Sequence, residues 1–277
     1  KEEDFTKINL KTGIFLLAVP MILEMIMESL FAVVDIFFVG KLGETAIAAV
    51  GLTEALVGVV YSIGFGVSMA ATAIVARRFG EKEYEKAGSA AFQLIVVGIA
   101  VSLVISVIGY VFAYDLLKLM GADAQVLESG ITYTQVTFIG NTPILLLFLI
   151  NGVFRGAGQV QVAMKTLWLS NGINLILDPI FIFGIGNFEG FGLEGAAWAS
   201  TIGRTIGVAY QLYHLFNGKH LLTIVRKNIV FQWGTVKKII TISSGGMGQF
   251  LIDSVAWIAI ARIMAEFGSA SVAGFTI

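Results

Sequence analysis

The sequence of 277 residues has no cysteine, only three prolines and few charged side chains. Without cysteine there are no disulfides and no thiolate metal sites. Charged residues make up 13% of the chain, whereas soluble domains carry roughly 25%. A soluble globule of this size would need more polar surface than that. The formal net charge of −1 also excludes the basic surface that binds nucleic acid.

Hydrophobic residues make up 57% of the chain, and the mean hydropathy is +0.86. Glycine is abundant, with 32 residues, and small residues let membrane helices approach closely. The first thirteen residues, KEEDFTKINLKTG, mix both charge signs before a long apolar run that contains Pro20. This pattern is a poor signal peptide, so we expect the first apolar run to be a retained span. The composition predicts an all-α, polytopic membrane protein.

Apolar segments long enough to cross a bilayer, which takes about 20 residues, occur seven times in the sequence. The expected spans cover about 14–39, 48–76, 87–114, 125–152, 160–184, 192–216 and 236–264.

Lysine and arginine are distributed unevenly between alternate loops, and cytoplasmic loops are enriched in them. With the N-terminus inside, the outer segments hold only Lys41 and Lys118. Arg204 and Arg262 lie within or at the end of spans. The inner segments hold Lys1, Lys7, Lys11, Arg77, Arg78, Lys82, Lys86, Arg155, Lys165, Lys219, Arg226, Lys227, Lys237 and Lys238. The asymmetry predicts a cytoplasmic N-terminus in the cell (inner or plasma) membrane.

A weak internal repeat relates the first span to the seventh. Sliding the chain by 225 residues places Glu28 on Asp253 and Ser29 on Ser254, and transporters are often built from such repeats. We therefore predict three parts. Residues 1–220 would form a six-span lobe, 221–235 a cytoplasmic loop, and 236–277 the first span of a second lobe. The complete protein would then have about 450 residues, twice the repeat offset.

The first span carries three carboxylates, and ionisable residues inside a membrane usually face a cavity or a partner. Helix geometry places Glu24, Glu28 and Asp35 within about 40° of one another. Glu24 and Glu28 are interpreted either as substrate-cavity carboxylates or as the lining of a wet vestibule. Pro20 is expected to help this helix bend.

Asp178 lies in the apolar run LILDPIFIF of the fifth span and precedes Pro179. The proline has no N–H, which frees the carbonyl of Leu175. Together with Asn174, these oxygens suit a proton or Na⁺, because hard cations prefer oxygen ligands. Asp35 lies at a similar depth below the outer end of its span.

Tyr133 in the fourth span and Ser200 in the sixth lie at about the same depth as the two aspartates. We therefore expect all of them to meet in one outer-half cavity. Arg204 shares a helix face with Ser200 and is interpreted as the partner of a carboxylate that holds helices together.

At these residues the sequence resembles the multidrug and toxic compound extrusion (MATE) family. The similar stretches are AVPMILEMIMESLFAVVDIFFVGKLG, ARRFGEKEYEKA, NGVFRGAGQ, NLILDPIFIF and GAAWAS. The resemblance implies two six-helix lobes, of which this chain holds the first and the start of the second. It also implies export of amphipathic, often cationic compounds in exchange for Na⁺ or H⁺, with no cofactor.

The resemblance further implies a cation site in the first lobe that consists of Asp35, Asn174, Asp178, Ser200 and Tyr133. Of these residues, Asp35, Asn174, Asp178 and Ser200 are the candidate ligands of Na⁺. Pro20 matches the first-span proline of the family. Two departures stand out: the family often has threonine where this chain has Ser200, and Glu24 and Glu28 are additional carboxylates.

Three alternatives remain from the sequence. A flippase for lipids or lipid-linked sugars would have similar lobes, but such cavities tend to be cationic and arginine is scarce in these spans. An intramembrane aspartyl protease would use two buried aspartates, but its Gly-x-Gly-Asp setting is absent here. A seven-span receptor fits the number of spans. The expected partners are the lipid bilayer, small amphipathic or cationic substrates and a second lobe, without nucleic acid.

Overall fold

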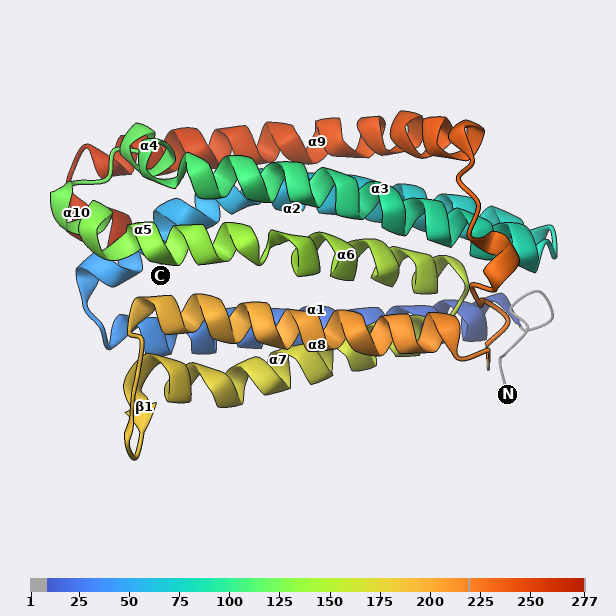
Figure 1. The fold of residues 1–277 in the computed structure, drawn as a ribbon, viewed down its shortest axis with the longest axis horizontal. Coiled ribbons are helices and arrows are strands. Elements are labelled where there is room, and N and C mark those ends of the chain that lie inside the picture. The colour runs from blue at the N-terminus through green and yellow to red at the C-terminus, as the bar shows by residue number, and fades with distance from the viewer. Residues whose placement is uncertain (1–8, 219, 277) are drawn as a thin grey trace.

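The computed structural model describes residues 9–218 and 220–276, and long helices dominate it (Figure 1). Lys1, Lys7 and Lys219 of the expected inner charges lie outside these residues. Helix α1 (Leu10–Gly40) begins at Asn9, whose side chain accepts a hydrogen bond from the backbone N–H of Lys11 at 3.1 Å. Such a cap satisfies one of the free N–H groups at a helix start.

Among the described residues, five helices are long and apolar enough to cross a membrane. They are α1, α2 (Glu44–Gly80), α3 (Tyr84–Val111), α7 (Val160–Phe183) and α9 (Trp233–Ala265). The fourth expected span is a bent pair, α5 (Ala124–Ile139) and α6 (Asn141–Gly156), with an angle of 42° between its halves. Pro143 explains the break, because it has no N–H to donate to Ile139 and its ring crowds that carbonyl.

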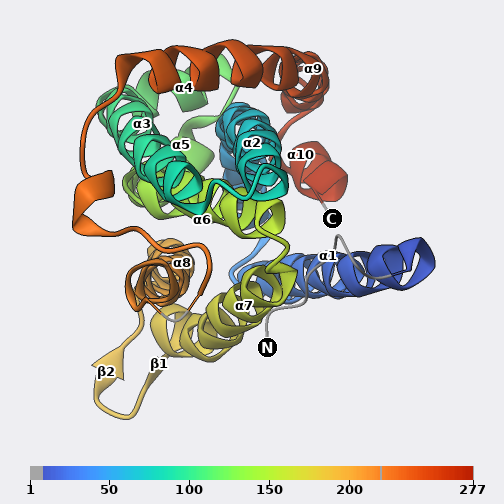
Figure 2. The ribbon, with the colours of Figure 1, turned by 90° about the vertical axis from the view of Figure 1, so that its right-hand side faces the viewer.

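Helix α8 (Leu193–Phe216) coincides with the sixth expected span but is not among the five. Its 24 residues reach about 36 Å, and it runs beside α7 (Figures 1 and 2). Glu194, Arg204 and Gln211 make it less apolar than its neighbours. All seven expected spans thus coincide with helical segments. Of the described helices, five are long and apolar enough to cross a membrane, or six if the bent pair is one span.

The shorter elements connect the long helices at the bundle ends. Helix α4 (Ala113–Leu119) follows α3, and a hairpin of β1 (Gly184–Ile185) and β2 (Phe188–Glu189) joins α7 to α8. Gly186 in the hairpin turn has φ 59°, a conformation that glycine adopts without steric cost. The loop after α8 contains the 3₁₀ helix η1 (Arg226–Asn228).

The helices form two groups when the bundle is viewed along its length (Figure 2). Helices α1, α7 and α8 lie on one side, and α2, α3, α5, α6 and α9 on the other. Helix α1 packs mainly against α7, and only Pro20, Glu24 and Val39 of its 31 residues are buried. Helix α1 continues as one helix through Pro20. Helix α1 therefore has little apolar burial of its own.

The element boundaries agree with the internal repeat. An offset of 225 residues places the end of α1, Gly40, on the end of α9, Ala265. It also places the start of α2, Glu44, on the start of α10 (Ser269–Thr276). Helix α9 lies against α2, where the hydroxyls of Ser62 and Ser254 are 2.6 Å apart.

Candidate functional site

Asp35, Asn174, Asp178 and Ser200, which we call the Asp178 cluster, come from α1, α7 and α8. The amide of Asn174 donates to Asp178 Oδ1 at 3.1 Å and to Ser200 Oγ at 3.1 Å. Asp178 is fully buried, and Asn174 is 2% exposed. Asp35 lies close enough to Asp178 for the two carboxylates to interact electrostatically. The structure therefore brings Asp35, Asp178 and Ser200, which the sequence placed at one depth, together with Asn174.

The close approach of α7 and α8 depends on Gly203. A Cβ atom at this position would lie 2.7 Å from the carbonyl oxygen of Ser170 and 3.2 Å from Cβ of Asn174. Small residues allow such contacts between membrane helices. Asn174 and Asp178 are one helical turn apart on α7, so both face α8 at this contact. The glycine thus lets Ser200 of α8 reach the amide of Asn174.

Three oxygens of the Asp178 cluster are buried without a hydrogen-bond partner among the described residues. They are Oδ1 of Asp35, Oδ1 of Asn174 and Oδ2 of Asp178. Within the same part of the chain, no lysine or arginine acts electrostatically on Asp178. A buried acceptor without a partner is costly, so these oxygens provide a place for a proton or a small cation.

Tyr133 is the fifth predicted site residue and is 5% exposed. It lines a small cavity of about 40 Å³ together with Asp35 and Ser200. Its ring therefore lies beside the Asp178 cluster, on the side of α5. No group of three or more His, Asp or Glu residues close enough to hold a metal occurs in the described ranges. A Na⁺ site here would use the neutral oxygens of Asn174 and Ser200 besides the two aspartates.

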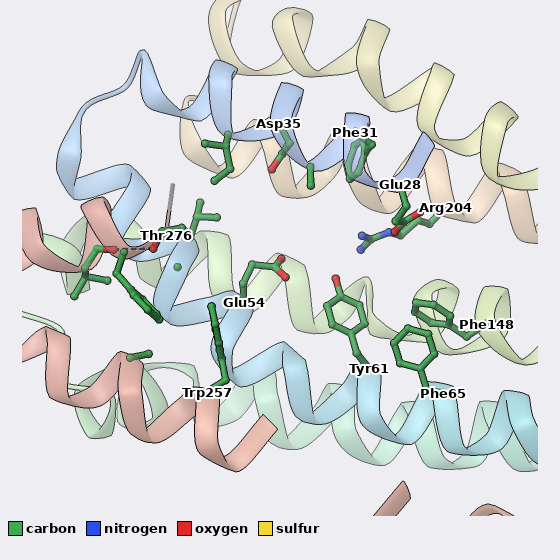
Figure 3. Close-up of a pocket in the computed structure, with 17 residues that line it drawn as sticks. Glu28, Phe31, Asp35, Glu54, Tyr61, Phe65, Phe148, Arg204, Trp257 and Thr276 are labelled. Atoms are coloured by element: carbon green, nitrogen blue, oxygen red, sulfur yellow. Dashed lines mark hydrogen bonds between the residues drawn. The ribbon is translucent and has the colours of Figure 1, made fainter. Parts of the chain in front are cut away.

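A larger cavity of about 380 Å³ opens beside the Asp178 cluster, between α1 and α2 (Figure 3). Its charged side chains are Glu28, Asp35, Glu54 and Arg204. Aromatic side chains supply much of the remaining wall, namely Phe31, Tyr61, Phe65, Phe148, Trp257 and Phe275. Asp35 lines both cavities and so connects the cluster to the larger space.

Glu54 and Tyr61 were missed by the sequence analysis. Both come from α2 and point into the larger cavity (Figure 3). The signal for Glu54 was present, since it is the only charged residue in the apolar run GLTEALVGVV. The reasoning that selected Asp35 and Asp178 would have selected it. Tyr61 had no comparable signal, because a tyrosine in a span is ordinary.

Glu24 and Glu28 have different surroundings although they are one turn apart on α1. Glu28 lines the larger cavity and accepts a hydrogen bond from Asn171 at 3.4 Å. Glu24, expected as a second cavity carboxylate, lines neither of the two cavities. Its carboxylate turns instead toward Arg155, at 3.8 Å. Arg155 therefore provides a counter-charge for Glu24, which the sequence analysis interpreted as a substrate-cavity carboxylate or as part of a wet vestibule.

Two amides complete the surroundings of Glu24. Asn151 of α6 donates to Glu24 Oε1 at 3.4 Å, and Gln211 of α8 donates to Asn151 Oδ1 at 2.6 Å. Glu24 is 6% exposed, and both amides are almost fully buried. We call Glu24, Asn151, Arg155 and Gln211 the Glu24 cluster. It joins α1 to α6 and α8 through polar contacts.

Comparison with known proteins places this arrangement in a family. Residues 20–180 match the MatE family. The chain belongs to the MatE family. The members found here are described as transporters rather than enzymes, so the protease interpretation is set aside. The match includes α2 to α6 and most of α1 and α7, and therefore Asp35, Asn174 and Asp178.

Curated MatE relatives have names that refer to drug export. One is "Probable multidrug resistance protein YoeA" of Bacillus subtilis (strain 168), 24% identical over 95% of this chain and 58% of the relative. Another is "Multidrug export protein MepA" of Staphylococcus aureus (strain MRSA252), 22% identical over 94% of this chain and 57% of the relative. The chain therefore spans little more than half the length of these relatives.

Solved structures of the same family share the fold. A MOP superfamily transporter from Pyrococcus furiosus Vc1 (DSM3638), whose reported pocket polarity is reversed, matches with a TM-score of 0.83 and 26% identity. The match covers 91% of this chain and 55% of that one. An inward-facing multidrug resistance MATE family transporter matches with a TM-score of 0.82 and 26% identity, over 94% and 60% of the two chains. The polytopic, all-helical MatE transporter fold is therefore established for this chain.

Proposed function

We propose that this chain is the first lobe, and the beginning of the second, of an antiporter that exports amphipathic or cationic compounds in exchange for Na⁺ or H⁺. The observation that carries the proposal is the group of buried, unpartnered oxygens on Asp35, Asn174 and Asp178. They lie beside a cavity whose size falls within the range of small-molecule sites, about 300–1,000 Å³. The names of the curated relatives support the export of drugs.

The Asp178 cluster is the proposed coupling site. A proton or Na⁺ held by Asp35 and Asp178 would reduce their mutual repulsion and satisfy oxygens that lack partners. Asn174 and Ser200 contribute neutral oxygens, and Tyr133 lies within the same polar pocket. A cation that binds one conformation more tightly than another shifts the equilibrium toward the first. In transporters of this kind the lobes then rock around the site.

The domain division and the orientation are parts of the same proposal. The coincidence of helix boundaries at an offset of 225 residues supports a first lobe of 1–220, an inter-lobe loop of 221–235 and a second lobe that begins at 236. The excess of Lys and Arg at one end of the bundle supports a cytoplasmic N-terminus in the cell membrane. Because the sequence lacks cysteine, labelling of a single cysteine introduced at Asn187 from outside intact cells tests this orientation.

The surroundings of the larger cavity favour cations over the anionic head groups that a flippase would carry. Glu28, Asp35 and Glu54 line it, against Arg204 as the single basic residue among its described lining. Export of lipid-linked phosphates would place a negative charge beside three carboxylates. The proposed partners of this chain are the lipid bilayer and the second lobe of the same protein.

The test uses the full-length protein in liposomes, under separate Na⁺ and pH gradients. We expect Asp178→Asn to reduce ion-driven export of a fluorescent cation to the level of protein-free liposomes. The reason is that a neutral amide neither takes up a proton nor carries the negative charge that attracts Na⁺. Asp115→Asn on the exposed α4 is the matched control and should export at the wild-type rate. Export by Asp178→Asn at the wild-type rate, with unchanged ion dependence, would contradict the proposal.

A further inference from the structure

Glu54 and Arg204 are not among the proposed ligands of the coupling cation, although both line the small cavity beside Asp35. Both also face the larger cavity (Figure 3). Arg204 extends from α8 and interacts electrostatically with Tyr61, Glu28 and Glu54. Glu54 and Tyr61 are two helical turns apart on α2 and so project from one face. A guanidinium from one group of helices thus lies between carboxylates of α1 and α2.

The charges that line this cavity do not cancel. Three carboxylates, Glu28, Asp35 and Glu54, face Arg204, and the described lining includes no second basic residue. Charges removed from water are costly unless paired, so Arg204 can compensate only part of this negative charge. A guest with a positive charge is therefore favoured over a neutral guest of the same shape.

Aromatic rings lie at both ends of the charged region. Phe65 and Phe148 have ring centroids 4.8 Å apart near Tyr61. Trp257 of α9 and Phe275 of α10 have centroids 4.9 Å apart at the other end. Aromatic faces attract organic cations, most strongly where water is excluded. The cavity therefore matches an organic cation that carries several aromatic rings.

We propose that Glu54 sets the charge selectivity of this cavity, and that Arg204 is its internal counter-ion, which an aromatic organic cation displaces. The inference rests on the proposed function, since it treats this cavity as the substrate site. Arg204 neutralises Glu54 when no substrate is bound. A cationic substrate takes over that role, and its rings pack against Phe65, Phe148 and Trp257. Glu54 is thus a specificity-determining residue rather than a proposed ligand of the coupling cation, although it lies close enough to Asp35 to interact with it electrostatically.

The experiment measures equilibrium binding to the purified full-length protein by calorimetry, without any ion gradient. The probes are tetraphenylphosphonium, a cation, and triphenylphosphine oxide, a neutral molecule of similar shape. We expect Glu54→Gln to weaken tetraphenylphosphonium binding by about tenfold, as for the loss of one charge-assisted contact. Binding of triphenylphosphine oxide should stay within about twofold, because its contacts are apolar.

Two further variants separate selectivity from folding. Arg204→Gln removes the competing internal cation and should tighten tetraphenylphosphonium binding by several-fold. Glu54→Asp keeps the carboxylate and should keep the preference for the cation over the neutral probe. Glu44→Gln, an exposed glutamate in the first turn of the same helix, is the matched control and should bind both probes as the wild type does.

The inference would be overturned if Glu54→Gln weakened the binding of both probes equally or changed the binding of neither. Weaker binding of tetraphenylphosphonium to Arg204→Gln would also overturn it. Loss of the cation preference in Glu54→Asp would overturn it as well. These outcomes differ from a failure of the proposed function. That failure appears in liposomes as unchanged ion dependence of Asp178→Asn, whereas the present measurement needs no coupling ion.

Discussion

The Glu24 cluster and the Asp178 cluster differ in how their carboxylates are compensated. In the Glu24 cluster an arginine nitrogen lies 3.8 Å from Glu24, and Asn151 donates a hydrogen bond to the same carboxylate. In the Asp178 cluster, Asp178 interacts electrostatically with a second carboxylate, that of Asp35, while Arg204 acts on Asp35. Both clusters contain a buried carboxylate, at least one buried amide and a residue of α8, and both have buried acceptors without a hydrogen-bond partner among the described residues. What separates them is that Glu24 has an arginine beside it and Asp178 has a second carboxylate.

This difference indicates what each cluster does. A buried carboxylate with a fixed counter-charge has no need of another cation, and breaking such a pair is strongly destabilising. A buried carboxylate without a counter-charge is itself unfavourable, and it therefore favours the binding of a mobile cation. The Glu24 cluster therefore suits the attachment of α1 to α6 and α8, and the Asp178 cluster suits reversible binding of Na⁺ or H⁺.

The largest effect is expected from neutralising the two carboxylates separately. Glu24→Gln leaves Arg155 without its counter-charge in a mostly buried site, and we expect the free energy of unfolding to fall by about 3 kcal/mol. Asp178→Asn removes an uncompensated charge and should leave the stability unchanged or raise it. Unfolding of the full-length protein in mixed detergent micelles measures both variants.

The double variant Glu24→Gln/Arg155→Gln tests the same pair in another way. The double variant has neither the carboxylate nor the guanidinium, so no buried charge is left unpaired. Part of the stability that Glu24→Gln loses should therefore return. Equal destabilisation by Glu24→Gln and Asp178→Asn would show that compensation does not separate the two clusters.

A smaller effect is expected within the Asp178 cluster from Ser200. Its hydroxyl accepts the hydrogen bond of Asn174 at 3.1 Å, and it is a proposed ligand of the coupling cation. Ser200→Ala removes one neutral hydrogen bond, worth about 1 kcal/mol, so the half-maximal ion concentration for export should rise about fivefold. Ser200→Thr keeps the hydroxyl and should stay near the wild type. Equal effects of alanine and threonine would exclude the oxygen as the cause.

Much of the fold and of the Asp178 cluster could be predicted from the sequence because both depend on local patterns. Long apolar runs predict the helices, and a carboxylate within such a run marks a buried polar site. Helical spacing alone places Asn174 and Asp178 on one face. Depth along neighbouring spans then brings Asp35 and Ser200 to the same level, and the structure confirms their proximity.

The remaining features depend on contacts between distant segments. Glu24 and Arg155 are far apart in the sequence, and nothing local to either residue indicates their pairing. The prediction therefore grouped Glu24 with Glu28 at a cavity. The break between α5 and α6 could have been foreseen from Pro143, and Glu54 from its charge in an apolar run. Arg204 was correctly expected to interact with carboxylates, but its position between α1 and α2 required the packing of α8.

The smallest effect is expected from a carboxylate that is paired but only partly buried. Glu83, between α2 and α3, accepts hydrogen bonds from Lys86 and from Arg78, the latter at 2.6 Å. These bonds, first that of Lys86, lower the pKa of Glu83. Any stabilisation is therefore present above the pKa of the unfolded chain and disappears as the pH falls through the lowered value. Solvent screens exposed pairs, whose contribution to stability is small.

We accordingly expect Glu83→Gln to leave unfolding in micelles and export in liposomes unchanged at neutral pH. The comparison with Glu24→Gln is the useful one, because each variant removes a carboxylate from an arginine, in a buried pair for Glu24 and in a partly exposed pair for Glu83. If both variants lowered the stability to the same extent, burial would not be the reason why Arg155 matters to Glu24. The contrast between the compensated and the uncompensated cluster would then need another cause, such as a specific role of Arg155 in the packing of α6.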